Sequence, residues 1–357
     1  MKLNSIELRN FRSYKERCFE FAPPGNLIIG DNGSGKTNLL EAIAYTSIGK
    51  SIRYHSDQDL ITTEQDFFAI EAYYDTDLQS KLKIQLSYSP SHKLLKINDQ
   101  ISRQLSTLLQ EVKVIYCAPD DIQLVNGSPR IRRQYFDLAI SQIFPQYLTA
   151  LREYLHLVEQ RNRLLKTDFQ PAEKNSWDQR FAAALAALYP YRQKYLSMLN
   201  SEFAESFRAI SAGIKDISLT YQPVLKNAFE QSQTAILNSI RAIENKEVLW
   251  QRSLIGAHLD DYSLEMEGRS MHSFASQGQK RIAVIVLKLI QAKLIQEYTA
   301  IKPVLLFDDV FAELDLEHSN RIRKLSFDAA QIFIASPKND ICGIWAELPI
   351  IRLGKLG

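Results

Sequence analysis

Alternating apolar and polar residues dominate the chain from its start to Cys117. This period of two is typical of half-buried β-strands, and turn residues or short helical segments separate the stretches. Strands are predicted at residues 3–8, 18–21, 27–29, 67–74, 82–88, 94–97 and 112–117, and helices after residue 35 and around 102–109. Strands interleaved with helices predict an α/β lobe.

Beyond Pro119 the apolar spacing changes to the three or four residues of an amphipathic helix. One helix is predicted over 130–166 and a second after the polar break 167–176, and Pro145 and Pro190 are expected to kink them. The stripe positions are Leu151, Leu155, Val158, Asn162 and Leu165, then Trp177, Phe181, Ala184, Leu188, Tyr191, Tyr195 and Met198. They predict an antiparallel helical hairpin, either inside a plain helical subdomain or as a protruding coiled coil.

The rest of the chain returns to strands mixed with helices. Strands are predicted at 217–221 and 262–266, a helix ends near Trp250, and a long helix covers 276–298. The apolar run 304–307 is typical of a strand buried on both faces.

A glycine-rich segment between the strand 27–29 and the next helix satisfies G-x-x-x-x-G-K-[ST]. It consists of Gly30, Asp31, Asn32, Gly33, Ser34, Gly35, Lys36 and Thr37. Glycines let backbone N–H groups surround a phosphate, and a helix N-terminus adds partial positive charge. Lys36 is expected to reach the β- and γ-phosphates, and the Thr37 hydroxyl to bind Mg²⁺. The segment therefore predicts an ATP site.

Two carboxylates, Asp308 and Asp309, follow the buried strand. They have the form of a Walker B motif, in which the first carboxylate holds Mg²⁺ and the second polarises the attacking water. Lys36 and Asp309 are thus the predicted catalytic residues, and Thr37 and Asp308 the predicted magnesium ligands.

The two nucleotide motifs stand near opposite ends of the chain, so a largely helical insertion is expected to split the ATPase domain. We expect a head formed by 1–118 and 299–357, and a helical arm or lid domain over 119–298.

The four residues that open the long helix are Ser276, Gln277, Gly278 and Gln279. A serine is a suitable N-cap, and the helix N-terminus could face a phosphate. The segment resembles the signature loop of ABC-type ATPases, and their D-loop is resembled by Glu313, Leu314 and Asp315. In that superfamily the signature loop meets ATP held by a second molecule, so the resemblance implies an ATP-dependent homodimer.

The composition bears on possible binding partners and on the cell compartment in which the protein works. Lys plus Arg number 43 against 41 for Asp plus Glu, so DNA binding would depend on local patches. The three cysteines are scattered outside any C-x-x-C pattern, which indicates a reducing compartment. We also expect no export signal and no membrane span, hence a cytoplasmic location.

The chain resembles, over nearly its whole length, the RecF family of bacterial recombination mediators, ABC-type ATPases related to SMC and Rad50 heads. The segments that carry the resemblance are 8–14, 30–37, 119–121, 127–137, 160–166, 256–261, 276–279, 308–310 and 313–315. The fold it implies is α/β: an ABC-type P-loop ATPase head split by a helical arm or lid domain with a short antiparallel hairpin.

This resemblance implies a protein of DNA replication, DNA damage repair and the SOS response. It would bind double-stranded DNA and junctions of single and double strands, dimerise there with ATP and Mg²⁺, and hydrolyse ATP slowly under DNA stimulation. It would support RecA loading at single-strand gaps and stalled replication, together with RecO and RecR. Candidate DNA contacts are Arg12, Arg130, Arg132, Arg133, Arg161 and Arg163. An ABC ATPase subunit of a membrane transporter and a P-loop small-molecule kinase are the alternatives.

Several positions depart from the patterns of these families. Ala257 and Leu259 replace the Pro and Arg of the family's Gly-Pro-His-Arg-Asp-Asp turn. Asp309 stands where a transporter ATPase has Glu, and slow hydrolysis is expected because misplacing a reactant by ~1 Å can cost ~10²-fold in rate. Ser336 stands where many ABC ATPases have a switch His. Residues 116–120 contain no Gln, so no Q-loop residue is assigned.

Overall fold

The computed structural model describes residues 1–53, 56–76, 80–211, 216–230, 232–326, 329–337 and 340–354. They belong to two compact units, which we describe separately. The first unit comprises Met1–Asp121, Ala209–Ser211 and Ile285–Gly357, and the second comprises Ile122–Arg208 and Ala212–Val284. Residues 285–298 therefore group with the first unit, whereas the predicted head resumes only at residue 299.

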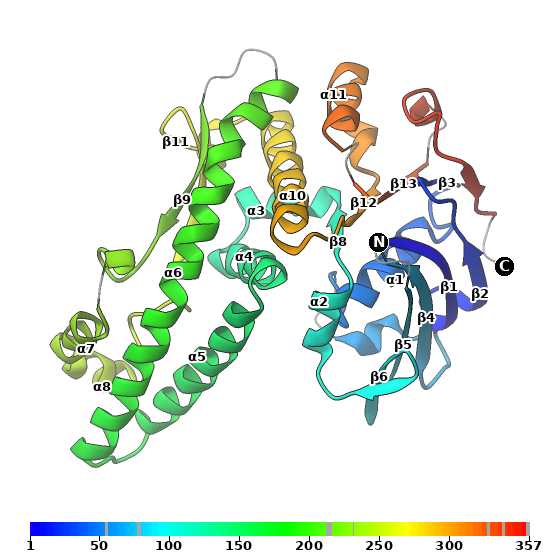
Figure 1. Ribbon diagram of the computed structural model, residues 1–357. Helices are drawn as coiled ribbons and strands as arrows, with labels where there is room; N and C mark the ends of the chain where they lie inside the picture. Colours follow the sequence, from blue (N-terminus) through cyan, green and yellow to red (C-terminus); the bar gives the residue numbers. More distant parts are fainter. Residues whose placement is uncertain are drawn as a thin grey trace. The chain divides into compact units, whose positions relative to one another are not determined.

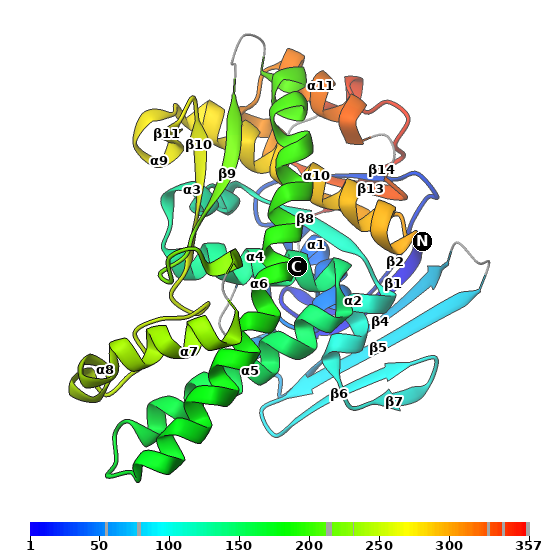
Figure 2. The same ribbon diagram turned by 60° about the vertical axis from the view of Figure 1, so that its left-hand side comes forward.

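Two sheets form the frame of the first unit (Figures 1 and 2). The parallel sheet has the order β14-β3-β13-β12-β8, and the antiparallel sheet has the order β2-β1-β4-β5-β6-β7. The parallel strands are β3 (Gly25–Ile29), β8 (Val114–Cys117), β12 (Val304–Asp308), β13 (Gln331–Ser336) and β14 (Ile350–Arg352). The antiparallel strands are β1 (Lys2–Phe11), β2 (Tyr14–Glu20), β4 (Phe68–Asp75), β5 (Lys81–Ser89), β6 (His92–Ile97) and β7 (Gln100–Ser102).

Helix α1 (Lys36–Ile48) contacts strands of both sheets and is buried along most of its length. A helix covered on nearly every side needs no single apolar stripe, which explains why its apolar residues follow one another without a helical period. Leu40 and Ile43 of α1 join Ile6 of one sheet and Leu306 of the other in a single core. The start of α1 is therefore held firmly in place. The unit's other α-helices are α2 (Leu108–Glu111) and α11 (Leu316–Ser326).

The second unit is mainly helical and carries a three-stranded antiparallel sheet of order β11-β10-β9. Its strands are β9 (Ile217–Gln222), β10 (Asp261–Met266) and β11 (Arg269–Ser270). Its shorter helices are α3 (Gln123–Asn126), α4 (Pro129–Ile143), α7 (Gln233–Ala242), α8 (Glu244–Trp250) and α9 (Met271–Phe274). Helices α6 (Pro171–Ile210) and α10 (Gln277–Thr299) begin here and end with residues of the first unit.

Helices α5 (Pro145–Leu164) and α6 form the predicted antiparallel hairpin, drawn in green in Figure 1. Arg192 contacts Tyr147, and Asp178 contacts Arg161, so the two helices run in opposite directions. Arg161 also contacts Glu247 of α8. The hairpin thus packs against other elements of its unit, as in a plain helical subdomain.

The structure confirms every predicted strand but corrects three local expectations. Pro145 begins a separate helix instead of kinking one, because proline lacks the N–H that an interior position would donate. Pro190 lies inside α6, and the kink expected there stays a prediction. The side chain of Leu155, predicted on the stripe, is 47% exposed. The helix expected around 102–109 is reduced to a short turn followed by α2.

Among the described residues, no helix combines the length with the apolar character that crossing a bilayer requires.

Substituting Gly25 tests how closely β3 and β13 approach. A Cβ at Gly25 would lie 1.8 Å from the carbonyl oxygen of Ile332, and the φ angle of +107° is unfavourable for other residues. We expect Gly25→Ala to lower the free energy of unfolding by more than about 2 kcal/mol. Gly343→Ala is the control, since a Cβ there meets no atom within 4 Å. Equal thermal melting midpoints for the two variants would contradict the close approach.

Candidate functional site

The carboxyl ends of the parallel strands lie at one edge of their sheet. The register pairs Ser336 with Ile29, Ala335 with Asp308, and Phe307 with Cys117. Ligands of open α/β sheets bind at this edge. The segment 30–37, which follows β3, and the two aspartates that end β12 therefore meet there.

The segment 30–37 has the backbone that a phosphate loop requires. Gly33 and Gly35 have φ angles of 83° and 95°, values that glycine adopts without strain. No side chain caps the N-terminus of α1, so its first N–H groups can face an anion. The buried Ser34 hydroxyl oxygen has no hydrogen-bond partner within the described part of the chain. A buried polar atom without a partner is costly, so a loop of this kind suits a polar ligand.

Lys36 folds back onto this loop. Its Nζ donates to the carbonyl oxygens of Gly30 at 2.7 Å and Asp31 at 2.8 Å. Burial lowers the pKa of Lys36, and the negative charges of Asp309, Asp308 and Asp31 oppose that shift. The ammonium group is therefore held beside both the loop and the aspartates.

Asp308 receives two hydrogen bonds from neutral hydroxyl groups. Thr37 Oγ1 donates to Oδ1 at 2.9 Å, although the two residues are 271 positions apart in the sequence. Tyr116, on β8, donates its hydroxyl to Oδ2 at 2.7 Å. Burial raises the pKa of Asp308, while these two hydrogen bonds and the charges of Arg53 and Lys36 act to lower it. The predicted magnesium ligands Thr37 and Asp308 are thus brought together.

Asp309 adopts a left-handed backbone conformation, with a φ angle of 53°. Its N–H donates to the carbonyl oxygen of Ala335 at 3.0 Å, which ties it to the neighbouring strand. Such strained non-glycine residues concentrate at functional sites. The catalytic role predicted for Asp309 stays a prediction.

Tyr116 could not be assigned from the sequence. It lies in the segment where a Q-loop Gln was sought, and no motif marks a tyrosine there. Its contact with Asp308 depends on β8 pairing with β12, two strands far apart in the chain. Only the strand order of the sheet could have revealed it.

The predicted signature residues begin α10 in the second unit. Gln279 N–H donates to Ser276 Oγ at 3.3 Å, and Ser276 N–H donates to Gln279 Oε1 at 2.9 Å. This reciprocal pair is a capping box, so the expectation of Ser276 as N-cap is confirmed. Ser276, Gln277 and Gly278 are exposed. An exposed helix start of this kind is accessible to a ligand or to another molecule.

The predicted D-loop residues Glu313, Leu314 and Asp315 connect a short 3₁₀ helix, Val310–Glu313, to α11 in the first unit. Asp315 Oδ1 accepts a hydrogen bond from the N–H of His318 at 2.8 Å. Hydrogen bonds from His318 hold the pKa of Asp315 below its usual value. Asp315 thereby caps α11, and its role in nucleotide contact stays a prediction.

The prediction of a DNA contact is wrong for Arg161. Its side chain is fully buried, and it pairs with Asp178 and Glu247 while donating to Ser253 Oγ at 2.8 Å. A guanidinium paired with two buried carboxylates has a structural role, because releasing it would remove its charge from Glu247 and leave Asp178 with the charge of Lys174. A charged side chain at a helical position looks the same in sequence whether it faces water or the core.

Three more of the candidate arginines form hydrogen bonds or ion pairs within the protein. Arg132 binds both carboxylate oxygens of Asp261 at 2.8 Å. Arg12 pairs with Glu41 at 3.3 Å. Arg133 donates to the carbonyl oxygen of Asp260 at 2.9 Å.

Arg130 and Arg163 are exposed. Arg163 forms a surface ion pair with Glu159, and such pairs are weak. These two arginines remain the best placed of the six candidates for phosphate contact.

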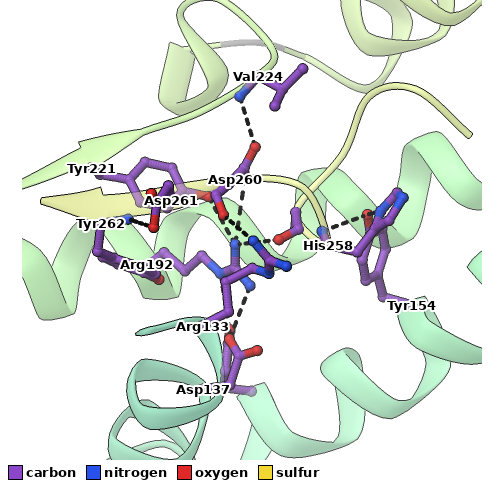
Figure 3. A network of polar contacts seen from close by, with 12 residues as sticks. Arg133, Asp137, Tyr154, Arg192, Tyr221, Val224, His258, Asp260, Asp261 and Tyr262 are labelled. Carbon is purple, nitrogen blue, oxygen red and sulfur yellow. Dashed lines mark hydrogen bonds and ion pairs between the residues drawn. The ribbon is translucent and has the colours of Figure 1, made fainter. Parts of the chain in front are cut away.

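A buried polar network holds the turn 256–261 in the second unit (Figure 3). Arg192 donates to the carbonyl oxygen of Ala257 at 3.0 Å and pairs with Asp137 at 2.9 Å. Asp260 accepts hydrogen bonds from Tyr221 and from the N–H of Val224. The turn is thus fixed from inside its own unit.

His258 and Leu259 occupy the centre of this turn. His258 Nδ1 lies 2.7 Å from the hydroxyl of Tyr154, and burial lowers the pKa of His258 to about 4. The imidazole is therefore neutral at pH 7. Leu259, which replaces the family's Arg, is 38% exposed. The turn is held by the contacts of Arg192 and Asp260, while the side chain of Leu259 is partly exposed.

Comparison with known proteins supports the family that the sequence resembles. The family described as "RecF/RecN/SMC N terminal domain" matches residues 2–348. A protein of Moorella thermoacetica named "DNA replication and repair protein RecF" is 34% identical over 340 residues, covering 94% of this chain and 90% of that protein. A protein of the same name from Lactobacillus delbrueckii subsp. bulgaricus is 33% identical, covering 95% and 92%.

Solved structures with a similar fold point to the same family. One described as "Structure of the recombination mediator protein RecF-ATP in RecFOR pathway" has a TM-score of 0.87 and 28% identity, covering 95% of this chain and 92% of that chain. An SMC head bound to the winged-helix domain of ScpA has a TM-score of 0.56 and 17% identity, covering 96% and 92%, a likeness of fold alone. The predicted α/β head related to SMC proteins is confirmed. The chain belongs to the RecF family of DNA replication and repair proteins.

Proposed function

We propose that the chain is an ATP-switched, DNA-binding recombination mediator that closes as a homodimer on duplex DNA. The observation that carries the proposal is the hydrogen bond between Thr37 and Asp308. It joins the two halves of a nucleotide site that lie in distant parts of the sequence. A solved structure described as RecF-ATP, with a TM-score of 0.87, supports ATP as the nucleotide.

Each residue of the site has a distinct task in this proposal. The N–H groups of 30–37 and the start of α1 surround the phosphates, and Lys36 turns from the loop carbonyls toward the β- and γ-phosphates. Asp309 orients the attacking water. Its side chain is one methylene shorter than Glu, so we expect slow hydrolysis.

Oxygen ligands of the site suit Mg²⁺. Thr37 and Asp308 offer a hydroxyl and a carboxylate, and nucleotide-bound Mg²⁺ takes few protein ligands besides phosphate oxygens and water. When bound, Mg²⁺ neutralises charge that develops on the phosphates.

The exposed start of α10 supports the proposed homodimer. We propose that Ser276, Gln277, Gly278 and Gln279 contact the triphosphate held by a second copy, with Glu313, Leu314 and Asp315 beside the same interface. The capping box supports this role because it fixes the backbone at the helix start. ATP would then join two heads, and its loss would release them.

Duplex DNA and ends of gaps are the proposed substrates. Arg130 and Arg163 are proposed phosphate contacts, which carry no sequence preference. By membership of the family we propose action with RecR, RecO and RecA at single-strand gaps. A transporter subunit and a small-molecule kinase are disfavoured, since the relatives are DNA replication and repair proteins.

The DNA switch can be tested by fluorescence anisotropy of a labelled gapped duplex, titrated with protein in ATP with Mg²⁺, in ADP, and without nucleotide. We expect tight DNA binding in ATP with Mg²⁺ and not in the other two conditions. We also expect the duplex to stimulate ATP hydrolysis. Equal binding in ATP and ADP would contradict the switch, and absence of binding in all three conditions would contradict the DNA partner.

Lys36→Ala tests the phosphate loop. Loss of charge-assisted hydrogen bonds should weaken ATP binding at least about 10-fold, and DNA-bound dimers should disappear with it. Lys302→Ala, an exposed lysine of the same unit, is the control. Isothermal calorimetry with ATP measures both variants. Tight ATP binding by Lys36→Ala would contradict the role given to Lys36.

Ser276→Arg tests the contact in trans. A bulky cation at the start of α10 should leave ATP binding by the monomer unchanged but prevent dimerisation in sedimentation velocity runs. Ser232→Arg is the matched control, because Ser232 also caps a helix by accepting from the N–H of Ala235. Normal ATP-dependent dimers of Ser276→Arg would show that no signature contact forms between subunits.

A further inference from the structure

We propose that Tyr116 is a positioning residue for Asp308, and that its hydroxyl fixes the orientation in which this carboxylate meets the metal. The inference rests on the proposed nucleotide site and deepens it. Tyr116 belongs to none of the motifs that identify the site, and its role comes from the geometry of the sheet.

The pairing of β8 with β12 directs the side chain of Tyr116 toward Asp308. β8 runs parallel to β12, and the register places Tyr116 beside Leu306, two residues before Asp308. Side chains two residues apart point to the same face of a strand. The long phenol ring therefore extends toward the carboxyl end of β12, where its hydroxyl lies 2.7 Å from Asp308 Oδ2.

The two carboxylate oxygens have different donors. Thr37 Oγ1 donates to Oδ1 at 2.9 Å, while Tyr116 holds Oδ2. Thr37 is itself a proposed metal ligand, so its hydroxyl must leave Oδ1 or share it when the metal binds. Tyr116, in contrast, is not a proposed metal ligand. It is the donor that can keep the carboxylate oriented, leaving Oδ1 for Mg²⁺.

Tyr116 is itself anchored through its backbone. Lys288 of α10 donates its Nζ to the carbonyl oxygen of Tyr116 and pairs with Asp121. Asp121 Oδ2 in turn accepts from the N–H of Ala118 at 2.6 Å. The carboxyl end of β8 is thus held from two sides. A rigid donor of this kind orients a metal ligand better than a mobile one, and loss of such outer partners commonly weakens metal affinity 10- to 100-fold.

Tyr116→Phe tests the inference, because it removes one oxygen and keeps the ring. Tyr195→Phe is the control, since the buried Tyr195 hydroxyl has no hydrogen-bond partner among the described residues. Mn²⁺ replaces Mg²⁺ and is titrated into each ATP-bound variant while free Mn²⁺ is followed by electron paramagnetic resonance. ATP binding in EDTA is measured separately by calorimetry.

We expect Tyr116→Phe to bind Mn²⁺ about 10-fold more weakly than wild type, with unchanged ATP binding in EDTA. Tyr195→Phe should match wild type in both. Unchanged Mn²⁺ affinity in Tyr116→Phe overturns the inference, and so does an equal loss of metal-free ATP binding, which would indicate a general structural role. Wild-type protein that binds neither ATP nor Mn²⁺ overturns the proposed function, and the inference with it.

Discussion

The order of strands in the parallel sheet is the constraint on which the site depends. β13 lies between β3 and β12, and its register sets Ser336 beside Ile29 and Ala335 beside Asp308. The loop after β3 and the aspartates after β12 can meet only because of this pairing. The second unit is inserted in the sequence between β8 and β12, two strands that lie side by side in the sheet.

Buried arginines are paired with carboxylates of their own unit. Arg161 and Arg192 are almost fully buried, and each is paired with carboxylates. Burying a charge is expensive unless its partners come with it, so these arginines specify one arrangement of the helices around them. The nucleotide site differs, because Asp308 accepts hydrogen bonds from the neutral hydroxyl groups of Thr37 and Tyr116. That arrangement leaves a carboxylate whose charge is available to a cation.

Local patterns and motifs were enough to predict the strands, the helical hairpin and the phosphate loop, because each depends on residues close together in sequence. Pro145 shows the limit of such patterns, since a helix that kinks and a helix that restarts have the same spacing. Arg161 and Tyr116 show a second limit. Whether a charge is buried, or which strand lies beside which, depends on contacts between distant parts of the chain. The family resemblance revealed neither the burial of Arg161 nor the contact of Tyr116 with Asp308.

We propose that ATP, held at the edge where Thr37 meets Asp308, joins two copies of the chain. Static light scattering during a titration with ATP and Mg²⁺ measures this association, with ADP as the comparison. We expect the mass measured by scattering to double with ATP and to return to that of one chain when ADP replaces it. A mass that stays that of one chain at saturating ATP, with and without duplex DNA, would contradict it.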